Sequence, residues 1–227
     1  MADKVDSIDT EKKVEGFITR HRPLFLGLLI TLVVGILALI TIIAIHEQST
    51  KKDLAAISTT EFALTKALPD GYTQLDVASR QETALAELEK YINKSGIVGV
   101  RANMLYADIA YQKADYANAL DHYVSAATLS KKNYTAPLCW FNAGVCAEEI
   151  GNVADALTYY QSAVDYSGEF LLVSHALFSI GRIKDASGDC TGAAEAYQKL
   201  VDGYEGTAWA KLAQSRLIDL KADGLIE

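Results

Sequence analysis

The chain has 227 residues, half of them hydrophobic, and a formal net charge of −8. The whole net charge lies after residue 45, where 24 acidic residues outnumber 16 basic ones. This balance argues against a nucleic-acid-binding protein, because such a protein needs a basic patch to displace counterions from phosphates. The three cysteines exclude a fully paired disulfide scaffold, since their number is odd.

A run of 22 residues without a charged side chain extends from Leu24 to Ile45. As a helix it would be about 33 Å long, which is enough to cross a bilayer core of about 30 Å. Its apolar length exceeds the roughly 7–15 residues of a signal-peptide core, and no small-residue cleavage pattern follows it. The run therefore predicts an uncleaved transmembrane helix over residues 24–45.

The basic residues on either side of this run predict its orientation. Five of them lie in the 20 residues before it, whereas only Lys51 and Lys52 lie in the 20 residues after it. Basic flanks stay on the cytoplasmic side of a membrane. We therefore expect a cytoplasmic tail over residues 1–23 and a single pass through a bacterial inner membrane, with the C-terminal part in the periplasm. An organellar membrane is the alternative.

Three small residues, Gly27, Thr31 and Gly35, are spaced by four within the apolar run. Such a stripe lets a second transmembrane helix approach closely, which would make the protein a homo-oligomer. Chance placement of small residues explains the spacing equally well.

Residues 96–207 contain an internal repeat with a period of 37 residues. Five columns keep this spacing in three copies: Ala107, Gly144 and Gly181; Ala114, Gly151 and Gly188; Ala119, Ala156 and Ala193; Tyr123, Tyr160 and Tyr197; and Ala126, Ala163 and Leu200. We expect the small residues of the first and third columns to let two paired helices approach closely. The second column supplies the turn between them, and the tyrosines fill the space between successive pairs.

The columns resemble the tetratricopeptide repeat, W-x2-L-G-x2-Y…A-x3-F. The middle copy matches best, with Trp140-x2-Ala143-Gly144-x2-Ala147 followed by Ala156-x3-Tyr160. The resemblance implies three repeats at about 100–133, 137–170 and 174–207. It also implies an all-α fold, in which a single N-terminal transmembrane helix precedes an α-solenoid of about three to four helical pairs and a C-terminal capping helix.

The segments on either side of the repeats complete this expected solenoid. Residues 46–99 are expected to form a linker helix and a degenerate first helical pair, with a helix over about 53–67, a surface loop over 70–79 and a second helix from Thr83. Residues 208–227 form the capping helix and tail, and four side chains of this helix are expected to point inward: Trp209, Leu212, Ala213 and Leu217.

The sequence offers no catalytic or metal-binding motif, so we expect neither an enzyme nor a cofactor or metal site. Cys139 and Cys146 are seven residues apart on one expected helix, which is about 10.5 Å along its axis and too far for a disulfide. All three cysteines are expected to be unpaired, and a redox or intermolecular role for Cys190 is the alternative. Glu148 and Glu149 lack a second catalytic set opposite them, which favours a solvated or ligand-binding role.

The resemblance also implies a ligand groove on the inner face of the first helix of each repeat. Matching the groove positions of the family to this chain gives eleven candidate residues: Arg101, Met104, Asp108, Tyr111, Leu138, Phe141, Val145, Glu148, His175, Phe178 and Arg182. They form an apolar strip with charged edges, which suits an extended or helical peptide with apolar anchors. Residues 133–181 contain five acidic residues and no Lys or Arg, which favours a basic or neutral ligand. Packing within the chain or self-association is the alternative use of this strip.

The order of parts and the length resemble the YfgM-like ancillary subunits of the SecYEG translocon. This resemblance implies a periplasmic adaptor that meets exported proteins near the translocon and associates with periplasmic chaperones. The alternatives are a structural scaffold of a cell-envelope complex, for outer-membrane assembly, cell wall or division, and a membrane protein that acts as a homo-oligomer.

Overall fold

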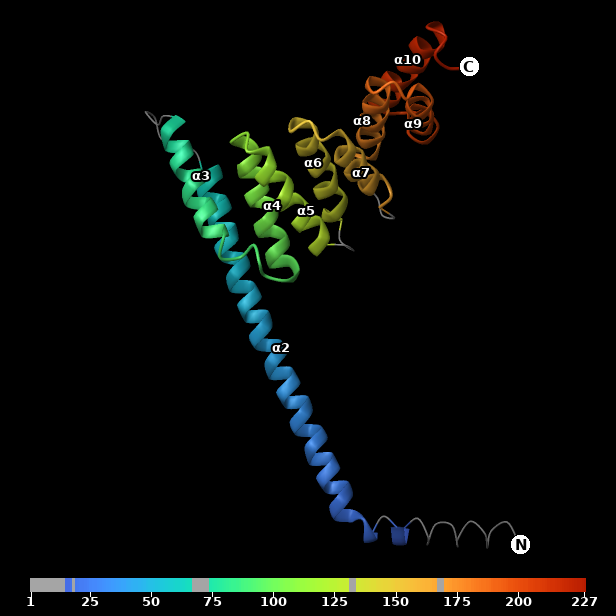
Figure 1. The fold of residues 1–227 in the computed structure, drawn as a ribbon. Helices are drawn as coiled ribbons and strands as arrows, with labels where there is room; N and C mark the ends of the chain where they lie inside the picture. Colours follow the sequence, from blue (N-terminus) through green and yellow to red (C-terminus); the bar gives the residue numbers. More distant parts are fainter. Residues whose placement is uncertain (1–14, 18, 67–73, 131–133, 167–169) are drawn as a thin grey trace, which may run out of the picture. The chain divides into compact units, whose positions relative to one another are not determined.

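The computed structural model describes residues 15–17, 19–66, 74–130, 134–166 and 170–227. Within these ranges the fold is all-helical and contains no strand (Figure 1). The main helices are α2 (Arg22–Thr65), α3 (Gln74–Leu88), α4 (Gly96–Gln112), α5 (Tyr116–Leu129), α6 (Thr135–Glu149), α7 (Val153–Val164), α8 (Val173–Ala186), α9 (Cys190–Gly203) and α10 (Ala208–Ala222). The chain divides into two compact units, Met1–Lys52 and Asp53–Glu227.

The described part of the first unit is dominated by the apolar portion of α2. This helix is long and apolar enough to cross a membrane, as judged by its length and composition. The hydroxyls of Thr31 and Thr41 donate hydrogen bonds to the carbonyl oxygens of Gly27 and Leu37. Because both hydroxyls are satisfied within the helix, they add little cost to burial in lipid. Thr31 and Gly35 line a shallow groove of about 420 Å³ on this helix. Association of two such helices into a homo-oligomer stays a prediction.

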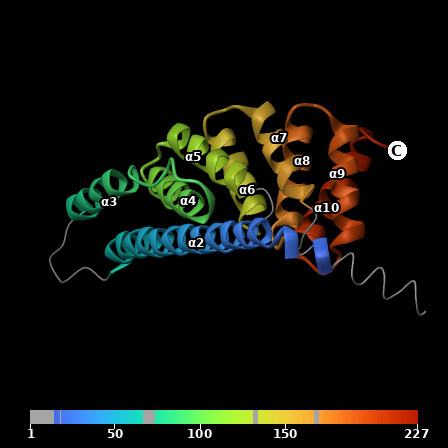
Figure 2. The ribbon, with the colours of Figure 1, turned by 90° about the horizontal axis from the view of Figure 1, so that it is seen from below.

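The second unit is a stack of helical pairs, α4 with α5, α6 with α7 and α8 with α9. The second helix of each pair also packs against the first helix of the next, and α10 packs against α8 and α9 (Figures 1 and 2). A hydrophobic core of buried residues continues from α4 to α9. This arrangement is that of a tetratricopeptide-like solenoid, in which each pair buries its apolar surface on its neighbours. The expected fold class is thus confirmed.

Two members of the first repeat column, Gly144 and Gly181, bring paired helices into close contact. A methyl group added at Gly144 would lie 2.8 Å from Cδ1 of Tyr160, and one added at Gly181 would lie 2.5 Å from Cε1 of Tyr197. Both distances are well below the roughly 3.5–4.0 Å of an ordinary carbon contact. The tyrosine rings therefore lie directly on the glycine backbone and are almost wholly buried.

The second column provides the turns between paired helices. Gly151 and Gly188 have φ values of 75° and 84°, and Ala114 takes a similar φ of 58° in the first repeat. A left-handed backbone costs a non-glycine residue roughly 1–2 kcal/mol, so the first turn is the most strained of the three. The next residue caps the following helix in each copy, since the side chains of Asp115, Asn152 and Asp189 accept a hydrogen bond from a backbone N–H three residues on.

The end of α2 belongs to the second unit and packs with α3 and α4. Ile57, Ala84 and Leu88 form a buried cluster with Val98 and Ala102. The expected loop over 70–79 is wrong from Gln74 onward, because α3 already begins there; residues 67–73 lie outside the described part of the chain. The helix α3 therefore begins ahead of the expected start at Thr83. Ala84 and Leu88 are buried and hold this helix in the cluster.

The helix α10 caps the stack, with one correction to its expected orientation. Its buried residues are Ala210, Ala213, Leu217 and Leu220, which lie on one helical stripe. Leu212 lies off this stripe and is 49% exposed, so its expected inward orientation is wrong.

Candidate functional site

The candidate groove residues lie on α4, α6 and α8, and we call the surface they form the A-helix face. Asp108, Tyr111 and Arg182 are exposed, whereas Phe141 is buried. The remaining seven are half-buried: Arg101, Met104, Leu138, Val145, Glu148, His175 and Phe178. The apolar members also hold the stack together, since Met104 packs against a buried cluster that contains Ala126 and Cys139, and Val145 packs against the main core.

Glu148 joins two successive repeats. One carboxylate oxygen forms an ion pair of 2.5 Å with Nη2 of Arg182, and the other accepts a hydrogen bond of 2.7 Å from the hydroxyl of Tyr160. Burial and this hydrogen bond both raise the pKa of Tyr160, so its hydroxyl stays protonated and donates. Glu148 therefore has a structural role on the A-helix face in addition to any contact with a ligand.

An aromatic row crosses the same face toward the C-terminus. The ring centroids of Phe141 and His175 are 4.9 Å apart, and those of His175 and Trp209 are 4.0 Å apart in a stacked arrangement. The ring centroid of Phe178 lies 5.2 Å from that of Trp209. Burial lowers the pKa of His175, and the charge of Arg182 lowers it further. Trp209 lies on α10, which packs against α8 and α9 as the first helix of a fourth repeat would. It was missed as a site residue because this helix was expected only as a cap.

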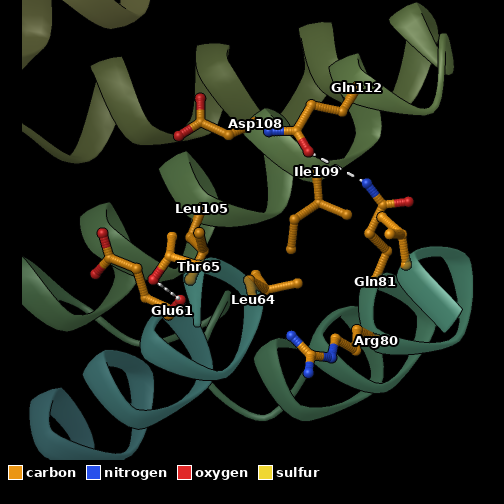
Figure 3. Close-up of a pocket in the computed structure, with 10 residues that line it drawn as sticks. Glu61, Leu64, Thr65, Arg80, Gln81, Leu105, Asp108, Ile109 and Gln112 are labelled. Carbon is orange, nitrogen blue, oxygen red and sulfur yellow. Dashed lines mark hydrogen bonds between the residues drawn. The ribbon is translucent and has the colours of Figure 1, made fainter. Parts of the chain in front are cut away.

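A cavity of about 250 Å³ opens at the other end of the A-helix face, within the second unit (Figure 3). It is lined by the end of α2, by α3 and by α4. Leu64, Leu105 and Ile109 provide apolar walls. The polar lining comes from both sides of the opening: Glu61, Thr65, Arg80, Gln81, Asp108 and Gln112.

Three hydrogen bonds from α3 hold the walls of this cavity together. Gln81 Nε2 of α3 donates a hydrogen bond of 3.2 Å to Oε1 of Gln112 on α4. Arg80 Nη1 donates to the carbonyl oxygens of Ala63 and Lys66 at 3.2 and 3.0 Å. These carbonyls lie at the C-terminal end of α2, where a cation is favoured by the helix dipole. The cavity thus depends on the position of α3, which the repeat columns do not predict.

The two carboxylates at the cavity differ in their surroundings. Glu61 forms an ion pair of 2.9 Å with Arg101, whereas Asp108 accepts a hydrogen bond of 2.5 Å from the hydroxyl of Tyr123. The pKa of Asp108 is raised overall, chiefly because burial removes water from its carboxyl group. The hydrogen bond from Tyr123 opposes this shift, and the charge of Glu61 adds to it. Asp108 still reaches solvent, so a cation from outside can meet it.

The cysteines are all free. Cys139 and Cys146 are buried, which raises the pKa of each thiol to about 12 and suppresses the reactive thiolate. Cys190 is half-buried. Across the residues that the structure describes, no three His, Cys, Asp or Glu side chains are grouped so as to hold a metal ion.

Comparisons with known proteins agree with this fold. A tetratricopeptide-repeat family model matches residues 125–170. A tetratricopeptide-repeat-containing protein of Treponema pallidum (strain Nichols) is 31% identical over 151 residues, which cover 65% of this chain; the chain spans 63% of the length of that relative. A solved tetratricopeptide-repeat protein from Parabacteroides merdae ATCC 43184 is 17% identical, with a TM-score of 0.55 over 78% of this chain and 61% of that one.

These findings support the tetratricopeptide-repeat fold and, through the repeats matched at residues 125–170, a protein-interaction module. Tetratricopeptide repeats generally act as scaffolds that bind other proteins rather than as enzymes.

The contacts of Glu148 lead to a testable expectation for stability. Replacing Glu148 with Ala leaves the buried hydroxyl of Tyr160 without this acceptor and Arg182 without its ion pair, which costs about 1–2 kcal/mol of unfolding free energy. Glu148→Gln keeps an acceptor and should cost less. The exposed neighbour Glu149 is the matched control, and Glu149→Ala should stay within about 0.5 kcal/mol of the parent protein. Equal urea-unfolding midpoints for Glu148→Ala and Glu149→Ala would contradict the structural role.

Proposed function

We propose that the protein is a membrane-anchored adaptor that binds exported proteins or periplasmic chaperones near the Sec translocon. Residues 24–45 anchor it in a bacterial inner membrane, with the tail 1–23 in the cytoplasm and the repeats in the periplasm. The observation that carries this proposal is the combination, in one chain, of an apolar helix able to span a membrane with a solenoid of the tetratricopeptide type. The distribution of basic residues around the helix supports the orientation.

The A-helix face is proposed as the binding surface. Its eleven candidate residues combine exposed charged groups with half-buried apolar ones, a composition that suits peptides with apolar anchors. The net charge also bears on the ligand. The residues after position 45 carry the whole net charge of −8, which would favour a basic or neutral ligand.

A structural scaffold of a cell-envelope complex is the second candidate function. It is favoured by the internal use of several candidate residues, since Phe141 is buried and Glu148 is paired with Arg182. Because these candidate residues already contact other residues of the chain, their surface suits one permanent partner better than a succession of different peptides.

Site-specific photo-crosslinking in cells separates these functions. A benzophenone amino acid replaces Tyr111 of the full-length, membrane-embedded protein, because Tyr111 is 37% exposed and Phe141 is buried. The adaptor function predicts crosslinks to several exported proteins and to translocon subunits. The same probe at Tyr134, an 80% exposed tyrosine outside the candidate groove, is the matched control and should give few of them. One stoichiometric partner would favour the scaffold, and crosslinks only within the chain would argue against an open binding surface.

The proposed orientation has a separate test. In a bacterium with an outer membrane, protease added to intact cells should leave the protein whole, and protease added to spheroplasts should digest residues 53–227. Protection of this part until the inner membrane is lysed would place the repeats in the cytoplasm and exclude the proposed encounter with exported proteins.

A further inference from the structure

The cavity at the start of the A-helix face combines aliphatic walls with polar and charged side chains, two carboxylates among them. Leu64 of α2 and Leu105 and Ile109 of α4 provide its apolar surface. Figure 3 shows Glu61 and Asp108 on the walls beside these residues. An aliphatic group that enters would lose its contact with water on several sides, which stabilises binding in proportion to the area buried.

The two carboxylates at this opening differ in whether they form an ion pair. Arg101 pairs with Glu61 at 2.9 Å, whereas the carboxylate of Asp108 accepts a hydrogen bond from the uncharged hydroxyl of Tyr123. Among the described residues, no Lys, Arg or His lies within ion-pair distance of Asp108. The nearby guanidinium of Arg80 bonds to carbonyl oxygens at the end of α2, and Figure 3 places it at the edge of the cavity opposite Asp108.

The size of the cavity limits what it can hold. Its volume of about 250 Å³ is below the roughly 300–1,000 Å³ of a typical small-molecule site. It has room for one or two side chains of a peptide that otherwise lies along the surface. Burial raises the pKa of Asp108, and the charge of Glu61 raises it further.

We propose that this cavity binds a peptide segment of a partner protein in which an aliphatic residue lies beside a Lys or Arg. The aliphatic side chain occupies the space between Leu64, Leu105 and Ile109, and the cation pairs with Asp108 at the opening. This proposal rests on the proposed function, to which it adds the class of ligand and the place where it binds. It also gives the degenerate first helical pair a role in recognition, since α2 and α3 provide half of the site.

Binding of defined peptides to the full-length protein in detergent micelles tests the proposal. The probes are three fluorescein-labelled heptapeptides, Gly-Ser-Leu-Lys-Ile-Ser-Gly and the same peptide with Gln or Glu in place of Lys. Fluorescence anisotropy should give the lowest Kd for the Lys peptide, an intermediate one for Gln and the highest for Glu. Asp108→Asn keeps the oxygen that accepts from Tyr123 while it removes the charge. It should raise the Kd of the Lys peptide about three- to fivefold, as expected for a solvent-accessible ion pair, and leave the Gln peptide unchanged.

The control is Glu149→Gln, which removes a similar charge from an exposed position on α6 outside the cavity. It should leave all three Kd values within twofold of the parent protein. A thermal unfolding curve for each variant shows that the fold is intact.

Three results would overturn the proposal: equal binding of the Lys, Gln and Glu peptides, no binding of any of them, or an equal effect of Asp108→Asn and Glu149→Gln on the Lys peptide. None of them bears on the proposed function, because Tyr111 does not line the cavity and crosslinks from it report partners elsewhere on the A-helix face. Loss of those crosslinks together with loss of peptide binding would refute both.

Discussion

The contact between a small residue on the first helix of a repeat and a tyrosine on the second is the constraint on which the rest of this structure depends. In the second and third repeats the ring lies against a glycine that has no room for a methyl group. Because the two helices approach so closely, the ring crosses from the core to the A-helix face. Its burial contributes to the core that joins successive pairs. In the second repeat the hydroxyl of Tyr160 reaches Glu148 on that face, whereas the buried hydroxyl of Tyr197 in the third repeat has no hydrogen-bond partner among the described residues.

The tyrosine hydroxyls connect the core to the candidate binding surface. Tyr123 donates to Asp108 and Tyr160 donates to Glu148, so two carboxylates on the A-helix face are held by groups from inside the stack. The two ends of the face then differ. Toward α10, Glu148 is paired with Arg182 and aromatic rings pack together. Toward α2 a cavity lies beside Asp108, which forms no ion pair with any residue that the structure describes. A surface closed at one end and open at the other suits a ligand that binds mainly through the open end.

The sequence predicted the features that repeat, the long apolar helix and the capping helix, and it missed the start of α3 and the contacts between repeats. The 37-residue columns located the turns at Ala114, Gly151 and Gly188, because each copy reports the same local geometry. The start of α3 at Gln74 has no counterpart in the columns, since it depends on packing against α2 and α4. The burial of Phe141 and its row with His175 and Trp209 arise from contacts between repeats, which a position within one helix does not indicate. The cavity was missed for the same reason.

The most direct test of this account is the unfolding free energy of Gly144→Ala in the full-length protein, compared with that of Gly203→Ala. Both changes replace a helical glycine, but a methyl group at Gly203 meets no atom within 4 Å, so it should stabilise by about 0.5–1 kcal/mol through helix propensity alone. At Gly144 the methyl group displaces the ring of Tyr160, and overpacking of this kind costs about 1–3 kcal/mol. The account predicts that Gly144→Ala is less stable than the parent protein while Gly203→Ala is not. Equal stabilisation by both would show that the ring does not depend on the glycine, and would contradict the account.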